Sequence, residues 1–114
     1  MDEVKYKYTI VKEVTADDIE NIMESALEGI SYWAADASIV ALKPSDDGMY
    51  TSRALTHGYA VRIYDDEEEK WHRLTLNKFL KGLALMQKQD FYDYDMYDAD
   101  SVIQYALFGK QVYA

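Results

Sequence analysis

The stretch between residues 87 and 101, QKQDFYDYDMYDADS, gathers five aspartates and four aromatic rings, with no basic residue after Lys88. Carboxylates at this density suit three tasks: coordinating a divalent cation, imitating the phosphates of nucleic acid, or contacting a basic protein. A second acidic run, DDEEE, occupies residues 65–69. The two runs hold ten of the twenty-one acidic residues, so they are the first candidates for a functional surface.

The aspartates do not follow the spacing of an EF-hand calcium loop. Counting from Asp93, the fifth position of the loop falls on Tyr97 instead of an aspartate or asparagine. Asp98 stands at the sixth position, where the sharp turn of that loop requires glycine. We therefore expect no metal site and no cofactor.

Catalytic chemistry has little support in the sequence. His57 and His72 are the only histidines, and neither belongs to a metal or nucleophile motif. The chain has no Gly-rich phosphate loop, no GxSxG and no HExxH. It also has no cysteine, which removes disulfides, thiol nucleophiles and thiolate zinc sites. We predict a protein that is not an enzyme; the alternative is a small metal-dependent enzyme whose carboxylates converge from distant segments.

The net charge of −9 indicates which partners the chain prefers. Nucleic acid and anionic membranes are polyanions, so a basic protein is the expected partner. Tyrosine is enriched where proteins bind one another, and three tyrosines lie in the polar stretch. The predicted partner-binding residues are the acidic and tyrosine side chains of the two runs: Asp65, Asp66, Glu67, Glu68, Glu69, Tyr92, Asp93, Tyr94, Asp95 and Tyr97.

Nucleic-acid mimicry is one version of this hypothesis. In an extended segment, carboxylates two positions apart lie roughly 6–7 Å from each other, a spacing comparable to that of neighbouring phosphates. Asp93 and Asp95 have this separation in sequence. The same residues also suit an ordinary acidic interface, and the carboxylates of both runs could serve only to keep the chain in solution.

Length and composition favour one cytoplasmic domain spanning residues 1–114. A chain of 114 residues suits a single core, and a 49 % hydrophobic content with five glycines and one proline favours a folded chain. No apolar run reaches the roughly 20 residues of a membrane span, and the first residues lack the apolar core of a signal peptide.

Hydrophobic periodicity predicts the elements of the first half. Alternation over residues 4–10 predicts a strand, and Thr15 caps a helix that runs to Gly29. The segment 31–42 either extends this helix or forms a strand at residues 38–42; the β-branched Ile39 and Val40 favour the strand. A short helix over 50–58 follows.

The second half predicts a hairpin and two helices. Residues 59–64 and 70–76 form the hairpin, with the acidic run 65–69 at its tip. Thr75 caps a helix in which Gly82 is unfavourable. Asp98 caps a second helix, with Asp100 in its first turn and Gly109 at its end, and residues 110–114 add an edge strand.

These elements define an α+β fold, a small antiparallel sheet with about four helices packed mainly on one face. Each helix and strand has an apolar face, and these faces form the predicted core. Its members are Ile19, Ile22, Met23, Leu27, Val61, Ile63, Leu76, Phe79, Leu80, Leu83, Val102, Ile103, Ala106 and Leu107.

Three segments, IMESALEGISYWA, LTLNKFLKGLALM and DADSVIQYALFGKQVYA, carry a resemblance to known proteins. They resemble a group of small acidic proteins encoded by phages, prophages and other mobile elements of Gram-positive bacteria. The resemblance implies a host cytoplasm as the compartment. It also implies a non-enzymatic inhibitor of a host defence protein, for example of a CRISPR or restriction system, or of a DNA-handling protein. The alternative is a structural or regulatory phage protein that forms a homo-oligomer, such as a homodimer.

Overall fold

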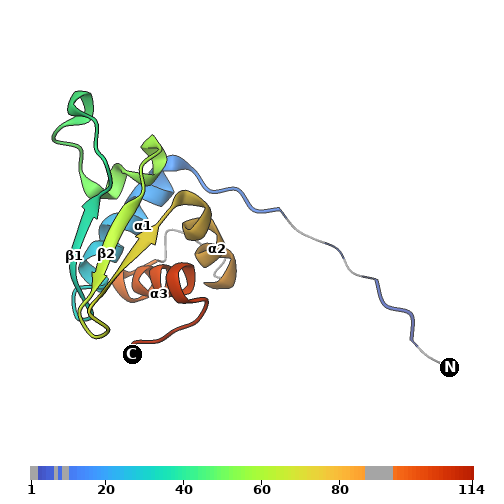
Figure 1. Ribbon diagram of the computed structural model, residues 1–114. Helices are drawn as coiled ribbons and strands as arrows, with labels where there is room; N and C mark the ends of the chain where they lie inside the picture. The colour runs from blue at the N-terminus through green and yellow to red at the C-terminus, as the bar shows by residue number, and fades with distance from the viewer. Residues whose placement is uncertain (1–2, 7, 9–10, 87–93) are drawn as a thin grey trace.

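A three-stranded antiparallel sheet and three α-helices make up the fold in the computed structural model, which describes residues 3–6, 8, 11–86 and 94–114. The helices cover one face of the sheet (Figure 1). The α-helices are α1 (Ala16–Gly29), α2 (Leu76–Met86) and α3 (Met96–Phe108). The strands are β1 (Ala34–Ile39), β2 (Val61–Asp65) and β3 (Lys70–Leu74), in the order β1-β2-β3. The α+β class is confirmed.

Helix α1 forms where its capping signals predict it. The hydroxyl of Thr15 accepts a hydrogen bond from the Asp18 backbone N–H at 3.1 Å, and the Asp18 carboxylate accepts one from the Thr15 N–H at 3.3 Å. This reciprocal pair satisfies two N–H groups that a helix start leaves without partners. The apolar side of α1, from Ile19 to Ala26, is buried in the core.

The hairpin of β2 and β3 is also confirmed, and its register pairs Asp65 with Lys70 at the acidic turn. Inward-facing Val61, Ile63 and Asp65 alternate with the exposed Arg62 and the half-buried Tyr64. On the other face of the sheet, the Arg62 guanidinium lies 4.6 Å from the ring centre of Trp71.

The predicted strand over residues 38–42 is misplaced, because β1 begins four residues earlier. Pairing with β2 determines its length: Ala34 lies opposite Asp65, and Ile39 lies opposite Val61. Ala41 adopts a positive φ of 51°, which takes the chain out of the extended conformation.

The predicted helix over residues 50–58 consists instead of two short 3₁₀ turns, η2 (Thr51–Arg53) and η3 (Leu55–His57); a third turn, η1 (Pro44–Asp46), precedes them. Leu55 and Ala54 are buried, whereas the other side chains of these turns stay at the surface. Gly58 ends η3 with a φ of 86°, as its sequence position predicts. The described residues therefore hold three α-helices rather than four.

Close helix crossings explain Gly82, which is unfavourable for α2 on propensity alone. A Cβ atom on Gly82 would lie 2.4 Å from the carbonyl oxygen of Val102 in α3. At the first residue of α3, a Cβ on Gly29 would lie 2.1 Å from the carbonyl oxygen of Met96. The two glycines allow α1 and α2 to approach the backbone of α3.

The predicted N-terminal strand is wrong at the residues that the structure describes. Residues 3–6 and 8 have no strand partner, and Val4, Tyr6 and Tyr8 are all more than two-thirds exposed. Residues 3–6 and 8 lie away from the sheet and helices (Figure 1). Alternation of apolar and polar residues predicts a strand only where a neighbouring strand supplies hydrogen bonds and an apolar face is covered.

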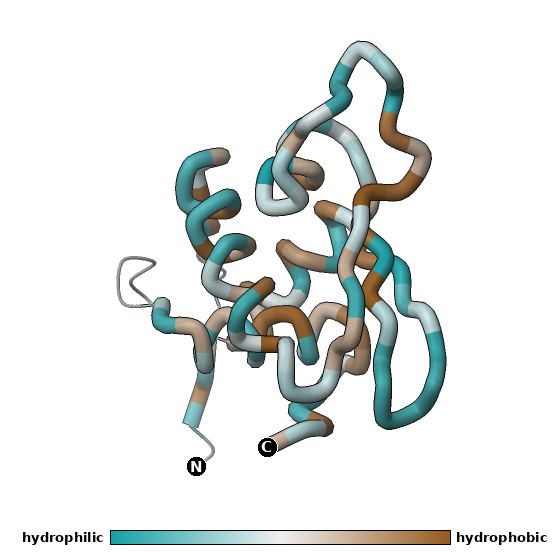
Figure 2. The backbone as a smooth tube through the Cα atoms, turned by 90° about the vertical axis from the view of Figure 1, so that its left-hand side faces the viewer, coloured by the Kyte–Doolittle hydropathy of each residue, from teal (hydrophilic) through white to brown (hydrophobic). Residues whose placement is uncertain are grey.

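Most of the predicted core is buried or half-buried, but Leu80 is 37 % exposed and lies outside it. The prediction missed the largest buried side chain, Trp33, because Trp33 follows α1 and belongs to no periodic pattern. Figure 2 shows hydrophobic (brown) and hydrophilic (teal) residues interleaved along the helices and strands. Among the described residues, no helix has both the length and the apolar character needed to cross a membrane.

Candidate functional site

The acidic hairpin turn is built on a buried carboxylate. Asp65 ends β2 with its side chain fully buried, so the prediction that it contacts a partner is wrong. Its Oδ1 accepts hydrogen bonds from the backbone N–H groups of Glu67 and Glu68 at 3.0 and 3.1 Å. Its Oδ2 accepts a hydrogen bond from the Tyr113 hydroxyl at 2.6 Å. Asp65 therefore shapes the turn and anchors the C-terminal segment.

Burial and hydrogen bonding act against each other on the pKa of the Asp65 carboxyl. Burial raises this pKa, but hydrogen bonds from Tyr113 and from the backbone of Glu68 and Glu67 outweigh burial and lower it below its usual value. In the hydrogen bond between Tyr113 and Asp65, burial and the neighbouring Asp65 raise the pKa of the Tyr113 hydroxyl. Asp65 is the charged partner and Tyr113 the neutral donor.

The four residues that follow Asp65 are exposed, as the sequence predicts for a partner-binding loop. These residues, Asp66, Glu67, Glu68 and Glu69, bring four carboxylates to the hairpin tip. Glu69 adopts a positive φ of 53°, which closes the turn before β3. The loop thus presents its negative charge on a backbone that Asp65 holds in place.

The second acidic run serves in part to begin α3. Asp95, rather than the predicted Asp98, is the N-cap, and its carboxylate accepts a hydrogen bond from the Asp98 N–H at 2.8 Å. Asp98 completes a capping box from the third helical position. The observed cap lies three residues before the predicted one, because Asp95 and Asp98 form an Asp-x-x-Asp capping box.

The tyrosines of this run differ in their surroundings. Tyr94 is only 9 % exposed and belongs to the core, so the prediction that it anchors a partner is wrong. Tyr97 is 71 % exposed, as a contact residue should be. The predicted contact residues Tyr92 and Asp93 lie outside the described residues.

Asp100 lies in the second turn of α3 and not in the first turn as predicted, because the helix begins at Met96, and it has a structural role that its position does not predict. Its buried carboxylate accepts hydrogen bonds from Trp33 Nε1 at 2.8 Å, from the Tyr32 hydroxyl at 2.7 Å and from Gln104 Nε2 at 3.0 Å. Burial and the bond to Asp100 raise the pKa of Tyr32 to about 12, so Tyr32 remains a neutral donor. The spacing of Asp100 and Gln104, four residues apart on one helix face, is the only sequence signal of this cluster.

Gln104 explains why the predicted edge strand over residues 110–114 is wrong. The buried Gln104 Oε1 accepts hydrogen bonds from the N–H groups of Val112 and Tyr113 at 2.8 and 2.7 Å. Its Nε2 donates to the Tyr113 carbonyl oxygen at 3.2 Å. One side chain thus supplies the hydrogen bonds that a neighbouring strand would have supplied.

Trp33 joins the two acidic segments. Its indole N–H binds Asp100, its carbonyl oxygen accepts a hydrogen bond from the Asp66 N–H at 2.9 Å, and its ring stacks on Tyr113 at 5.2 Å. The hairpin turn and the start of α3 therefore lie at the same end of the molecule (Figure 1). We call this region the acidic end: the exposed carboxylates of residues 66–69 and Asp95, with the exposed rings of Tyr32 and Tyr97.

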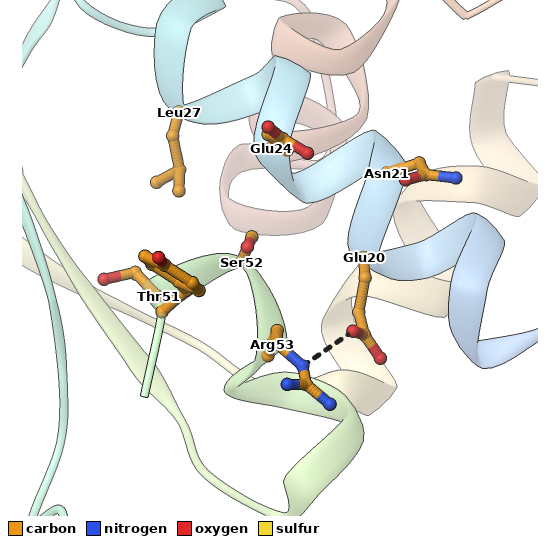
Figure 3. A pocket seen from close by; sticks show the side chains of 8 residues that line it. Glu20, Asn21, Glu24, Leu27, Thr51, Ser52 and Arg53 are labelled. Atoms are coloured by element: carbon orange, nitrogen blue, oxygen red, sulfur yellow. Dashed lines mark hydrogen bonds and ion pairs between the residues drawn. The ribbon is translucent and has the colours of Figure 1, made fainter. Parts of the chain in front are cut away.

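A separate open groove of about 690 Å³ lies between α1 and η2 (Figure 3). Glu20 and Arg53 form an ion pair at 3.0 Å on its wall, and Thr56 donates a second hydrogen bond to Glu20 at 2.9 Å. His57 Nδ1, in η3, lies 2.8 Å from the carbonyl oxygen of Arg53, the last residue of η2. These groups are engaged with one another and hold η2 against α1.

No family model matches the chain, and no curated protein or solved structure matches it either. The likeness of three segments to small acidic phage proteins therefore stays a prediction from sequence.

Proposed function

We propose that the protein is a non-enzymatic binding protein that contacts a basic protein partner through the acidic end. The observation that supports this proposal is the double attachment of Trp33, which brings the hairpin loop and the start of α3 to one place. Without that attachment, the two acidic runs would be separate features of the sequence. Residues 66–69 and Asp95 together form a surface whose charge is complementary to that of a basic groove.

The arrangement of charge and aromatic area fits this role. Residues 66–69 give exposed carboxylates that would attract a basic partner over a distance set by the ionic strength. Tyr32 and Tyr97, which are 50 % and 71 % exposed, offer apolar ring area, although the Tyr32 hydroxyl itself is bound to Asp100. Such rings commonly contribute most of the binding energy at the centre of an interface.

The resemblance to phage and prophage proteins suggests the kind of partner. We propose a host defence protein or a DNA-handling protein, because such proteins carry basic grooves for nucleic acid. An inhibitor that occupies this groove would compete with DNA or RNA for the partner. The inhibitor would itself have no measurable affinity for nucleic acid, since its net charge is −9.

Affinity capture from a Gram-positive bacterial lysate tests the proposal. Immobilised wild-type protein is compared with a loop variant carrying Asp66→Asn, Glu67→Gln and Glu69→Gln, which keeps side-chain shape and removes three charges. We expect a basic protein that the wild type retains and the loop variant loses, and that DNA displaces from the wild type. Retention of the same proteins by both would contradict the proposal, as would direct binding of DNA to the wild type at physiological salt.

A further inference from the structure

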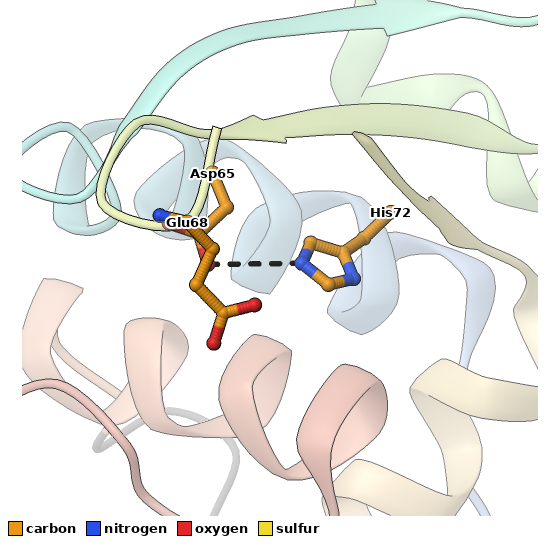
Figure 4. Close-up of side chains that lie close together, drawn as sticks. All are labelled: Asp65, Glu68 and His72. Carbon is orange, nitrogen blue, oxygen red and sulfur yellow. Dashed lines mark hydrogen bonds and ion pairs between the residues drawn. The ribbon is translucent and has the colours of Figure 1, made fainter. Parts of the chain in front are cut away.

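Three side chains at the turn end of the β2–β3 hairpin converge on one point. Asp65 at the end of β2, Glu68 in the loop and His72 in β3 each offer one ligand atom, and these atoms lie within 4.8 Å of one another. Figure 4 shows the imidazole directed toward the Asp65 carboxylate, with Glu68 beside both. The expectation of no metal site follows from the aspartate spacing of the second acidic run, and these three hairpin residues lie outside that run.

The His72 side chain has a nitrogen without a hydrogen-bond partner. Its Nε2 is buried, although the side chain as a whole is 13 % exposed, and lies 3.7 Å from Asp65 Oδ2, beyond hydrogen-bond distance. The ring packs edge-on against Phe108 with 5.0 Å between ring centres. Buried polar atoms in folded proteins usually have a partner, so His72 Nε2 is free to bind a ligand without giving up a hydrogen bond.

The Asp65 carboxylate is held in place by other contacts. Two backbone N–H groups bind its Oδ1, and the Tyr113 hydroxyl binds its Oδ2. A carboxylate oxygen has two lone pairs, so Oδ2 can accept this bond and still contribute to a cation. Hydrogen bonds of this kind orient the ligands of metal sites before the metal arrives.

We propose that Asp65, Glu68 and His72 bind a zinc ion, with water completing its coordination. Zinc accepts imidazole nitrogen and carboxylate oxygen at roughly 2.0–2.2 Å in a tetrahedron, which places neighbouring ligand atoms about 3.4 Å apart. The 3.7 Å between His72 and Asp65 is close to this separation, and Glu68 is exposed and able to adjust. Calcium and magnesium prefer a full set of oxygen ligands and fit less well.

Bound zinc would cross-link the two strands of the hairpin to the loop between them. It would hold the acidic loop in one conformation and neutralise part of the charge of Asp65 and Glu68. Zinc binding does not require the proposed partner binding. The loop variant that tests partner binding leaves the three proposed zinc ligands unchanged. Failure of partner binding and failure of zinc binding are therefore separate results.

The test is a calorimetric titration of the full, tag-free chain with zinc chloride after treatment with a chelator. Glu68→Gln removes one ligand from an exposed position, and Glu67→Gln removes the same charge from the neighbouring position as a matched control. We expect one saturable site, a rise in the thermal midpoint, about tenfold or greater weakening by Glu68→Gln, and no comparable change in Glu67→Gln.

Cobalt provides an independent readout, because a tetrahedral Co²⁺ site with a nitrogen ligand has a characteristic visible absorption. This absorption should appear with the wild type and with Glu67→Gln and should be lost in His72→Gln. Circular dichroism of each variant without metal verifies that it is folded. Absence of a saturable zinc site would overturn the proposal and leave His72 as a direct partner of Asp65. Equal weakening of zinc binding by Glu68→Gln and Glu67→Gln would also overturn it, because it would show only diffuse attraction of zinc to the loop.

Discussion

The Tyr113 hydroxyl donates a hydrogen bond to the buried carboxylate of Asp65 at 2.6 Å, although the two residues are 48 positions apart. This bond attaches the C-terminal segment to the hairpin that carries the acidic loop. Replacing Tyr113 by phenylalanine removes the donor and keeps the ring that stacks on Trp33. We expect a loss of about 1.5–3 kcal/mol in the free energy of unfolding, because the acceptor is charged and buried.

Urea denaturation measures this loss. Tyr50→Phe is the matched control, since Tyr50 is 76 % exposed and its variant should stay within about 0.5 kcal/mol of the wild type. Equal stability of the Tyr113→Phe variant and the control would show that the bond to Asp65 does not hold the C-terminal segment.

The same bond predicts a pH dependence. The pKa of Asp65 is lower in the folded protein than its usual value. Its contribution to stability is therefore present above the unfolded pKa of about 3.9 and is lost as the pH falls through the folded pKa. Tyr113→Phe removes one of the bonds that lower this pKa, so the loss of stability between about pH 5 and pH 2 should be smaller. Denaturation midpoints at several acidic pH values give the slope; an unchanged slope would contradict this assignment.

The crossing of α2 and α3 should not tolerate a side chain at Gly82. Alanine is the better helix former, yet its Cβ would lie 2.4 Å from the Val102 carbonyl oxygen, and backbone cannot move aside cheaply. We expect Gly82→Ala to lower the free energy of unfolding by about 1–3 kcal/mol. Lys81→Ala on the exposed side of the same helix should be nearly neutral, and a stabilised Gly82→Ala variant would show that the helices are not this close.

Two leucines of α2 form a second matched pair. Leu83 is 8 % exposed and packs in the core, whereas Leu80 is 37 % exposed. Leu83→Ala should cost about 2–5 kcal/mol through lost burial and an unfilled cavity. Leu80→Ala should cost much less in the same thermal or urea unfolding experiment; equal costs would mean that α2 is rotated relative to the structure described.

Local patterns in the sequence predict the helices and the hairpin but not the polar core that joins them. Thr15 caps a helix where its sequence context indicates, and the loop from 66 to 69 is exposed as its charge predicts. By contrast, Asp65 and Asp100 are acids of the same two runs that fold inward. Their partners, Tyr113 and Trp33, are 48 and 67 positions away, and no local pattern identifies contacts at that separation.

Exposed tyrosine at the acidic end should determine how long a partner stays bound. Tyr97 is 71 % exposed at the start of α3, so Tyr97→Ala removes a ring without opening the core. We expect its complex with the captured basic protein to dissociate about tenfold faster. Tyr50→Ala is the control, because it removes a similarly exposed ring from the groove between α1 and η2. Equal dissociation rates for the two variants would exclude Tyr97 from the interface.

The central claim is that the carboxylates of residues 66–69 attract a basic partner, and the association rate constant tests it most directly. Surface plasmon resonance at low and physiological salt compares the loop variant with a control variant carrying Glu13→Gln, Glu24→Gln and Asp47→Asn, three exposed acids elsewhere. Asp95 is left intact because it caps α3. We predict that the loop variant associates about tenfold more slowly at low salt and depends less on salt, with the control near the wild type. Identical association rates for the loop variant and the control would contradict the claim, because the acidic end would then contribute only net charge.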